Sequence, residues 1–155
     1  MPSTVVVTTP SSREICVTRR FDAPARLVFD FHTKSEHVQK WLLGPPGWSM
    51  PICEIDLRAG GRYRYVWRND KDGTEFDVQG EFSEISAPER FVHTEAMDGM
   101  PGEALCTYAF ADTDGGSTLT VTMIFESQEE RDAALESGMT DGMSASYGRL
   151  EEILV

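Results

Sequence analysis

The sequence predicts a single α+β domain in which a curved antiparallel sheet wraps around a long C-terminal helix. Three observations support this fold class: a strand and two short helices near the N-terminus, a series of strands separated by turn residues, and a helical stripe of apolar residues at the end. Helices in such folds pack on one side of the sheet, so the long helix is expected across its concave face. The predicted order is one strand, two helices, six strands and one helix.

The first strand is predicted between residues 13 and 21. Ile15, Val17 and Phe21 alternate there with polar residues, which is typical of a strand with one buried face. Arg19 is the exception, because it falls on the apolar side of this alternation. The strand is therefore expected to bury one face with a single arginine on it.

Two short helices are expected to follow this strand. Asp22 can accept hydrogen bonds from free backbone N–H groups and Pro24 suits a first helical position, so the first helix is predicted over residues 24–32. The second helix has Ser35 as its expected cap and ends at the Gly and Pro residues of 44–47. The residues predicted to point inward are Leu27, Val28 and Phe31 in the first helix and Val38, Trp41 and Leu42 in the second.

Turn residues divide the middle of the chain into a meander of six strands. The turns are expected at residues 59–61, 70–73, 87–88, 98–102 and 112–116. Side chains alternate between the two faces of a strand, so the pattern after the first turn fixes its inside and outside. The inward face there holds Tyr63, Tyr65 and Trp67, and the outward face holds Arg62, Arg64 and Arg68.

A single C-terminal helix of about 25 residues is predicted from its apolar spacings of three and four. Ser127 and Glu130 have the spacing of a capping box, which marks the start of the helix. Gly138, Gly142 and Gly148 each cost a helix about 1 kcal/mol relative to alanine. Either close approach of another backbone or room for a ligand explains Gly138 and Gly142, which lie on one face. The apolar stripe is Leu135, Met139, Met143, Tyr147, Leu150 and Leu154.

Composition argues against a membrane protein, a secreted protein and a nucleic-acid-binding protein. Among 155 residues, no apolar run approaches the roughly 18 that a membrane span needs. Residues 1–12 lack the features of a secretory signal and are expected to form a flexible tail before one domain at residues 13–155. A net charge of −12 disfavours nucleic acid and anionic lipid as partners. Three dispersed cysteines without a CxxC pair indicate reduced thiols and a cytoplasmic location.

Several separated motifs occur in one order: RFDAP at residues 20–24, VF at 28–29, Trp41, EIDLR and GG within 54–61, GEF at 80–82, PER at 88–90, and GM with Gly142 and Leu150 in the last helix. They resemble the family of activators of the 90-kDa heat-shock protein ATPase, homologue type, over residues 13–154. This family belongs to the START-like SRPBCC superfamily, so the resemblance implies a helix-grip fold with a pocket. Met143 and Tyr147 depart from the family pattern, which often has an aromatic residue and a leucine at these positions.

The resemblance leaves three functions open. A stand-alone module of this size is similar to bacterial members that are mostly uncharacterised and are presumed to hold small apolar ligands, so binding of a small hydrophobic or amphipathic molecule is the first expectation. The second is interaction with a 90-kDa heat-shock chaperone and stimulation of its ATPase. In the eukaryotic co-chaperone, however, a separate N-terminal domain carries much of that contact. The third is a cyclase-like or dehydratase-like enzyme, in which polar groups such as His93, Glu95 and Tyr108 converge in the pocket.

Aromatic and methionine side chains on the predicted inward faces are the candidate ligand contacts, because they suit planar apolar ligands. The same residues also suit an ordinary core. No catalytic residue and no cofactor are predicted. A metal site is not predicted either, since His32 and His37 lack a carboxylate or thiolate at ligand spacing. The predicted cavity residues are Trp41, Tyr63, Tyr65, Trp67, Phe76, Phe82, His93, Tyr108, Met123, Phe125, Met139, Met143 and Tyr147.

Overall fold

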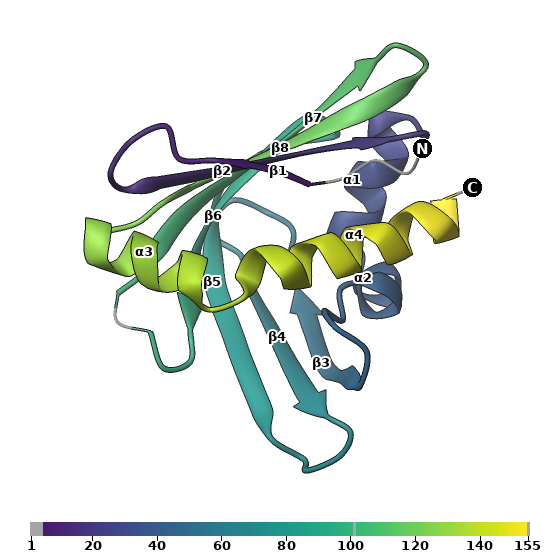
Figure 1. The fold of residues 1–155 in the computed structure, drawn as a ribbon. Coiled ribbons are helices and arrows are strands. Elements are labelled where there is room, and N and C mark those ends of the chain that lie inside the picture. The colour runs from purple at the N-terminus through teal and green to yellow at the C-terminus, as the bar shows by residue number, and fades with distance from the viewer. Residues whose placement is uncertain (1–4, 101, 155) are drawn as a thin grey trace.

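The computed structural model describes residues 5–100 and 102–154, and within them eight strands form one antiparallel sheet that curves around the C-terminal helix (Figure 1). The strand order is β1-β2-β8-β7-β6-β5-β4-β3, so the N-terminal strands lie beside the last strand of the meander. The strands are β1 (Val6–Thr8), β2 (Glu14–Phe21), β3 (Trp48–Ile55), β4 (Arg62–Asn69), β5 (Glu75–Ser86), β6 (Arg90–Met97), β7 (Ala104–Thr113) and β8 (Gly116–Ile124). The six predicted strands of the meander are β3 to β8.

The predicted facing of β4 is confirmed. Tyr63 is 2% exposed and packs into the core, whereas Arg64 lies on the outer face and forms an ion pair with Asp77 of β5 at 2.7 Å. Arg68 pairs with Glu75 in the same way at 2.6 Å. Cross-strand pairs of opposite charge are a common feature of a solvated sheet face, and each contributes little to stability.

Arg19 points into the core from β2, as its place in the alternation indicates. It is 3% exposed and its guanidinium lies 4.8 Å from the centre of the Phe21 ring. The guanidinium also pairs with Glu151 at 3.1 Å and donates to the carbonyl oxygens of Arg20 and Tyr147. A buried charge is tolerated only with such partners, so Arg19 ties β2 to the C-terminal helix.

The two short helices form, but their expected caps are wrong. Helix α1 spans Ala25–Thr33 and α2 spans Ser35–Trp41, so Ser35 is the first residue of its helix and not the cap. The backbone N–H of Ala25 donates to Asp112 of β7 at 2.8 Å, in place of the predicted cap Asp22. A carboxylate from a distant strand thus satisfies the start of α1.

The inward face of α1 also differs from the prediction. Val28 is buried as expected, but Phe29 and His32 take the central positions, and Leu27 and Phe31 are only partly buried. The reason is that β7 packs against the face of α1 that carries Phe29 and His32. The Phe29 and His32 rings lie 5.3 Å and 5.1 Å from the ring of Phe110 on β7; the packing surface of α1 is therefore rotated toward β7.

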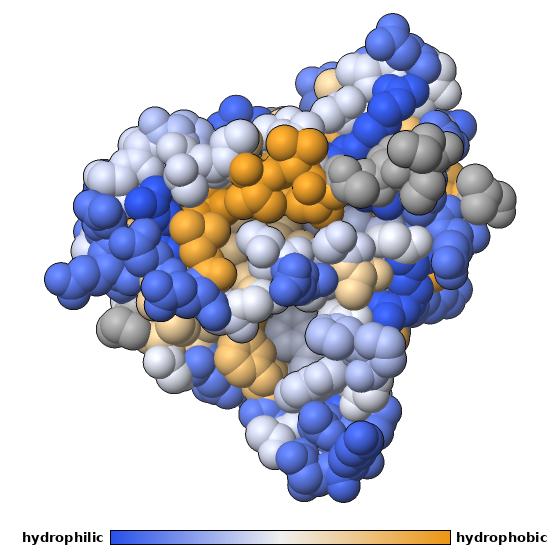
Figure 2. Space-filling view, in the orientation of Figure 1, coloured by the Kyte–Doolittle hydropathy of each residue, from blue (hydrophilic) through white to orange (hydrophobic). Residues whose placement is uncertain are grey.

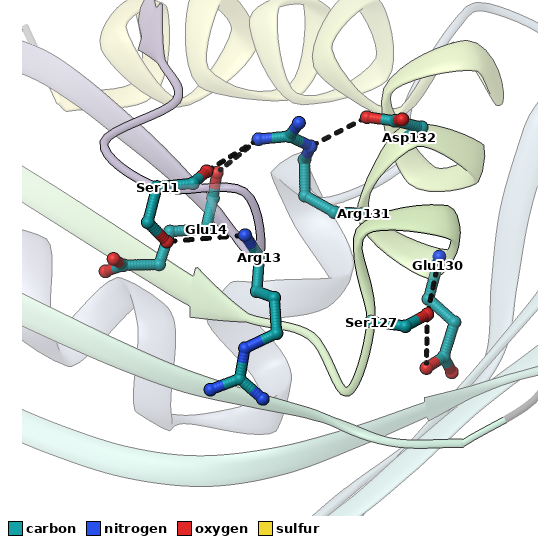
Figure 3. A network of polar contacts seen from close by, with 7 residues as sticks. All are labelled: Ser11, Arg13, Glu14, Ser127, Glu130, Arg131 and Asp132. Atoms are coloured by element: carbon teal, nitrogen blue, oxygen red, sulfur yellow. Dashed lines mark hydrogen bonds and ion pairs between the residues drawn. The ribbon is translucent and has the colours of Figure 1, made fainter.

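The single long helix predicted at the C-terminus is wrong, because it is divided into α3 (Gln128–Glu136) and α4 (Met139–Leu154). The break lies at Gly138, whose φ of +85° is a left-handed conformation that ends helices and favours glycine. The predicted cap is confirmed: the Ser127 hydroxyl accepts from the Glu130 backbone N–H at 3.1 Å and donates to the Glu130 carboxylate at 3.3 Å (Figure 3).

Part of the segment predicted to be a loose tail is ordered. Residues 6–8 form β1, which pairs with β2, and residues 1–4 lie outside the described part of the chain. Arg131 of α3 donates to the carbonyl oxygens of Ser11 and Glu14 at 2.7 Å and 3.4 Å (Figure 3). Backbone pairing and this arginine hold the segment against the sheet. Within residues 5–100 and 102–154, the helices are too short or too polar to cross a membrane.

Alanine substitutions at Gly138 and Gly142 should have opposite effects on stability. Alanine at Gly138 must adopt a left-handed conformation, which costs about 1–2 kcal/mol. Alanine at Gly142 lies within α4 with no atom within 4 Å of its Cβ, so better helix propensity should add up to about 1 kcal/mol. Urea unfolding of both variants measures these changes. Equal effects of the two substitutions would contradict the helix break at Gly138.

Candidate functional site

The candidate site lies inside the curve of the sheet, beneath α4. Side chains alternate along a strand, and this places Tyr63 and Tyr65 of β4, His93 and Glu95 of β6, and Tyr108 of β7 on the inner side. The His93 ring centre lies 4.5 Å from that of Tyr63 and 5.4 Å from that of Tyr108. The polar groups expected to converge in an interior are thus neighbours in the fold.

The C-terminal half of α4 is fixed to the body of the protein by its aromatic packing. Tyr147 stacks on Trp41 of α2 with ring centres 5.2 Å apart, and its hydroxyl lies 3.2 Å from Nε2 of His32. The other ring nitrogen of His32 donates to the carbonyl oxygen of Val28, so Nε2 accepts from the tyrosine. Three buried rings therefore share one satisfied polar network.

Polar contacts reinforce this half of the helix. The Ser146 hydroxyl accepts from the backbone N–H of Gly44 at 2.8 Å. Arg149 donates to the carbonyl oxygens of Trp41 and Gly44 at 2.9 Å and 3.1 Å. The last carbonyl groups of a helix have no partner within it. Arg149 bonds one such group, that of Trp41 at the end of α2, and also the carbonyl group of Gly44 beyond it. The segment after α2 and the C-terminal half of α4 are thereby held together.

The N-terminal half of α4 is packed less tightly. Met139 and Met143 face the core but are only partly buried, and no atom lies within 4 Å of a Cβ placed on Gly142. The same is true of Gly138, so close approach of another backbone is the wrong explanation for these glycines. Figure 2 shows apolar residues reaching the surface between β1–β2 and the α3–α4 junction. The interior is therefore least sealed beneath this part of the helix.

Several polar atoms of the interior have no partner in the described part of the chain. The hydroxyls of Tyr65 and Tyr108 make no hydrogen bond there, whereas the hydroxyl of Tyr63 donates to the Thr94 carbonyl at 2.8 Å. The fully enclosed atoms without a partner are His37 Nδ1, Asp77 Oδ1 and Ser117 Oγ. Because the Tyr65 and Tyr108 hydroxyls are not among these, a water-sized molecule can reach them.

His93 presents a hydrogen-bond acceptor to the interior. The side chain is 5% exposed, and its Nδ1 donates to the Thr94 carbonyl at 2.9 Å. A neutral imidazole with a proton on Nδ1 leaves Nε2 as an acceptor. Burial lowers the pKa of His93 to about 4, and that of His32 likewise, so both rings are neutral near pH 7.

Glu95 is the acidic group of this interior. Burial raises its pKa to about 7, against the opposing effect of a hydrogen bond from the thiol of Cys106 at 3.9 Å. Burial also raises the pKa of Tyr63, Tyr65 and Tyr108, and the nearby charge of Glu95 adds to this effect. The interior therefore favours neutral groups, and Glu95 titrates near physiological pH.

A small cavity opens beside Glu95, where β6 ends and where β7 and α3 begin. Its volume is about 20 Å³, far less than the roughly 300 Å³ of a typical small-molecule pocket. Among the predicted cavity residues, Phe125 lines it. A wider open hollow of about 370 Å³ lies at the β7–β8 turn and is formed by Pro24 and residues 112–116. It contains none of the predicted residues.

The other predicted cavity residues lie in the core around this interior. The indoles of Trp41 and Trp67 donate to the carbonyl oxygens of Phe31 and Leu42 at 2.8 Å and 2.7 Å, so the protein itself supplies their partners. Their role in binding stays a prediction. Trp41, Tyr63, Phe82, His93, Met123, Phe125 and Tyr147 are buried, and Tyr65, Trp67, Phe76, Tyr108, Met139 and Met143 are partly buried.

Sequence reasoning missed two members of the site. Cys106 lies directly opposite His93 in the β6–β7 pairing and is fully buried, and His32 belongs to the network at the other end of the helix. The strand alternation of β7 could have identified Cys106 as an inward residue. No local signal places His32 beside Tyr147, because their contact joins α1 to α4.

A curved antiparallel sheet closed by a C-terminal helix defines the helix-grip class of the START-like proteins, as predicted. Residues 22–155 match the model of the family described as Activator of Hsp90 ATPase homolog 1-like protein, and the chain belongs to this family. No curated protein matches the chain.

Solved structures support the assignment of the fold. A protein from Rhodobacter sphaeroides is similar with a TM-score of 0.92 and 26% identity over 97% of each chain. A Mycobacterium smegmatis protein has a TM-score of 0.87 and 23% identity over 99% of this chain and 98% of its own. An AHSA1-like protein from Aeromonas hydrophila has a TM-score of 0.73 and 21% identity over 90% and 93%. The last two likenesses concern the fold alone.

Replacing Glu95 by glutamine should change how stability depends on pH. The folded pKa of about 7 lies above the unfolded value of 4.5, so the wild type loses stability as the pH rises through this window. The unfolding free energy of Glu95→Gln minus that of the wild type should therefore increase by up to about 3 kcal/mol between these values. Urea unfolding at several pH values provides the measurement.

The difference in unfolding free energy between Glu95→Gln and the wild type separates the effect of Glu95 from that of the buried histidines. His32 and His93 have lowered pKa values, so their contribution is lost as the pH falls from 6.5 toward 4 in both proteins. The groups facing Glu95 are Cys106 of β7, Tyr63 of β4 and Glu130 of α3. A free-energy difference that stays constant with pH would rule out a buried, neutralised Glu95.

Proposed function

We propose that this protein binds a small amphipathic molecule between the N-terminal half of α4 and the sheet. The observation that carries the proposal is the pair of hydroxyls, on Tyr65 and Tyr108, that have no partner in the described chain and yet lie inside the curve of the sheet. Because a water-sized molecule can reach both hydroxyls, they are open to a hydrogen bond from a molecule outside the chain. A ligand with a polar end supplies that bond.

The apolar part of the ligand has a suitable surface in Met139 and Met143. Methionine is flexible and polarizable, so it adapts to ligands of different shape. Both residues lie on the partly exposed stretch of α4 that follows the break at Gly138. A cavity of about 20 Å³ does not hold a typical ligand, so binding requires this half of the helix to move outward. The anchors at Ser146 and Arg149 confine that movement to the first turns.

The family name suggests a second candidate function, which is stimulation of the ATPase of a 90-kDa heat-shock chaperone. Membership of the family is the observation that favours it. A purified chaperone assayed for ATP hydrolysis with and without this protein tests the interaction. Both candidate functions are compatible with the cytoplasmic location that we infer.

Tyr65→Phe and Tyr108→Phe should weaken binding without loss of stability. The two hydroxyls have no partner to lose within the described protein, whereas a ligand loses one hydrogen bond worth about 1 kcal/mol. Thermal shift and titration calorimetry with a panel of 1-octanol, flavonoids and polyketides provide the measurements, since a ligand that binds the folded state raises its stability. Native mass spectrometry of the gently purified protein detects a ligand that is already bound.

Tyr63→Phe is the matched control. Its hydroxyl donates to Thr94 within the protein, so this variant should lose about 1 kcal/mol of stability and retain its affinity for the panel. Absence of any shift in the wild type across the whole panel would contradict the ligand-binding function. Stimulation of chaperone ATPase in the same preparation would then support the protein-partner function.

A further inference from the structure

One end of the interior presents hydrogen-bond acceptors and negative charge. The small cavity between β6, β7 and α3 is lined by three acidic residues, Glu95, Glu103 and Glu130, together with apolar residues that include Met97 and Phe125. No lysine, arginine or histidine lines it in the described part of the chain. A ligand group bound here meets carboxylates and apolar surface only.

Further carboxylates converge on the mouth of this cavity. One oxygen of Glu126 and one of Glu130 lie beside the position that a Cβ on Gly102 would occupy, so both approach the same point. Like charges this close repel each other unless a cation or a proton lies between them. Within residues 5–100 and 102–154, no ion pair involves Glu95, Glu126 or Glu130.

The neighbouring arginine does not neutralise this charge. Arg131 follows Glu130 directly, but its guanidinium points to Ser11, Glu14 and Asp132 on the other side of α3 (Figure 3). Glu130 is held instead by the Ser127 hydroxyl at the start of the helix. The negative potential of the cavity mouth is therefore available to a bound cation.

His93 is an independent acceptor on the same inner side of β6 as Glu95. It is 5% exposed, and its Nε2 has no hydrogen-bond partner in the described chain, while its Nδ1–H is used by Thr94. Residues two apart on a strand lie about 7 Å apart on one face. His93 does not line the small cavity itself, so a ligand that contacts both acceptors extends from Glu95 along the inner face of β6.

We propose that the polar end of the bound molecule is a protonated amine, held by Glu95 at the cavity and by Nε2 of His93 as a second acceptor. This inference rests on the ligand-binding function proposed above. An ammonium group is about the size of a water molecule, and the cavity of about 20 Å³ holds one group of that size. The methionine and phenylalanine side chains accommodate the carbon chain attached to it.

An organic cation fits this site better than a metal ion. The described residues contain no group of three or more His, Cys, Asp and Glu side chains placed to hold a metal. Calcium and magnesium need six or more oxygen ligands, and the apolar side of the cavity supplies none. A fatty acid is disfavoured as well, because its carboxylate would face Glu95, Glu103 and Glu130.

Titration calorimetry with 1-octylamine, 1-octanol and octanoate near neutral pH tests this inference, since the three molecules share one chain and differ in their polar end. Octylamine should bind the wild type at least about tenfold more tightly than octanol, and octanoate most weakly, because a hydrogen-bonded ion pair adds to the shared apolar contact. Glu95→Gln should weaken octylamine binding by about the same factor and so remove its preference over octanol. The exposed Glu89→Gln removes the same charge far from the cavity and should change nothing.

The possible results separate the two proposals. Octanol that binds as tightly as octylamine, in the wild type and in Glu95→Gln, would overturn the amine inference and leave the ligand-binding function standing. Equal losses of octylamine affinity in Glu95→Gln and Glu89→Gln would also overturn it, because attraction to the net charge of −12 would then explain the binding. Failure of all three molecules to bind would count against the ligand-binding function itself.

Discussion

The arrangement of this fold depends on the contacts that attach the C-terminal half of α4 to α2 and the sheet. Tyr147 packs between the indole of Trp41 and the ring of Phe21, while the buried Arg19 reaches across from β2 to Glu151. These contacts fix the helix to α2 on one side and to the sheet on the other. Because these contacts hold the C-terminal end of α4, its N-terminal end can lie over the sheet without a fully packed interface.

The two ends of the interior differ in how their polar groups are satisfied. At the anchored end, His32 bonds both Val28 and Tyr147, and the last carbonyl groups of α2 accept from Arg149. At the end nearer the helix break, acceptors and hydroxyls outnumber their partners in the described chain, and Glu95 has only a weak contact with a thiol. Natural proteins satisfy most of their buried polar groups, so a group of unpartnered acceptors and hydroxyls around one part of the interior points to a role outside folding.

Much of the fold follows from local chemistry that the sequence displays. The alternation around Tyr63 sets the face of β4, turn residues delimit the meander, and Ser127 caps α3 as expected. The features that escaped prediction depend on distant partners or on backbone geometry. Asp112 replaces the expected cap of α1, and the break at Gly138 depends on a backbone φ that the apolar spacing around it does not reveal. The raised pKa of Glu95 escapes for the same reason, because burial within the folded structure causes it.

The two halves of α4 make different contacts, and this difference affects which substitutions the protein can accept. Residues that hold the fold together, such as Tyr147 and Leu150, lie in one half of the helix, and those that face the proposed ligand, such as Met139 and Met143, lie in the other. Substitutions in the second half alter the shape of the interior while the stabilising contacts persist. The interior can therefore change shape over a few mutations while the protein stays folded.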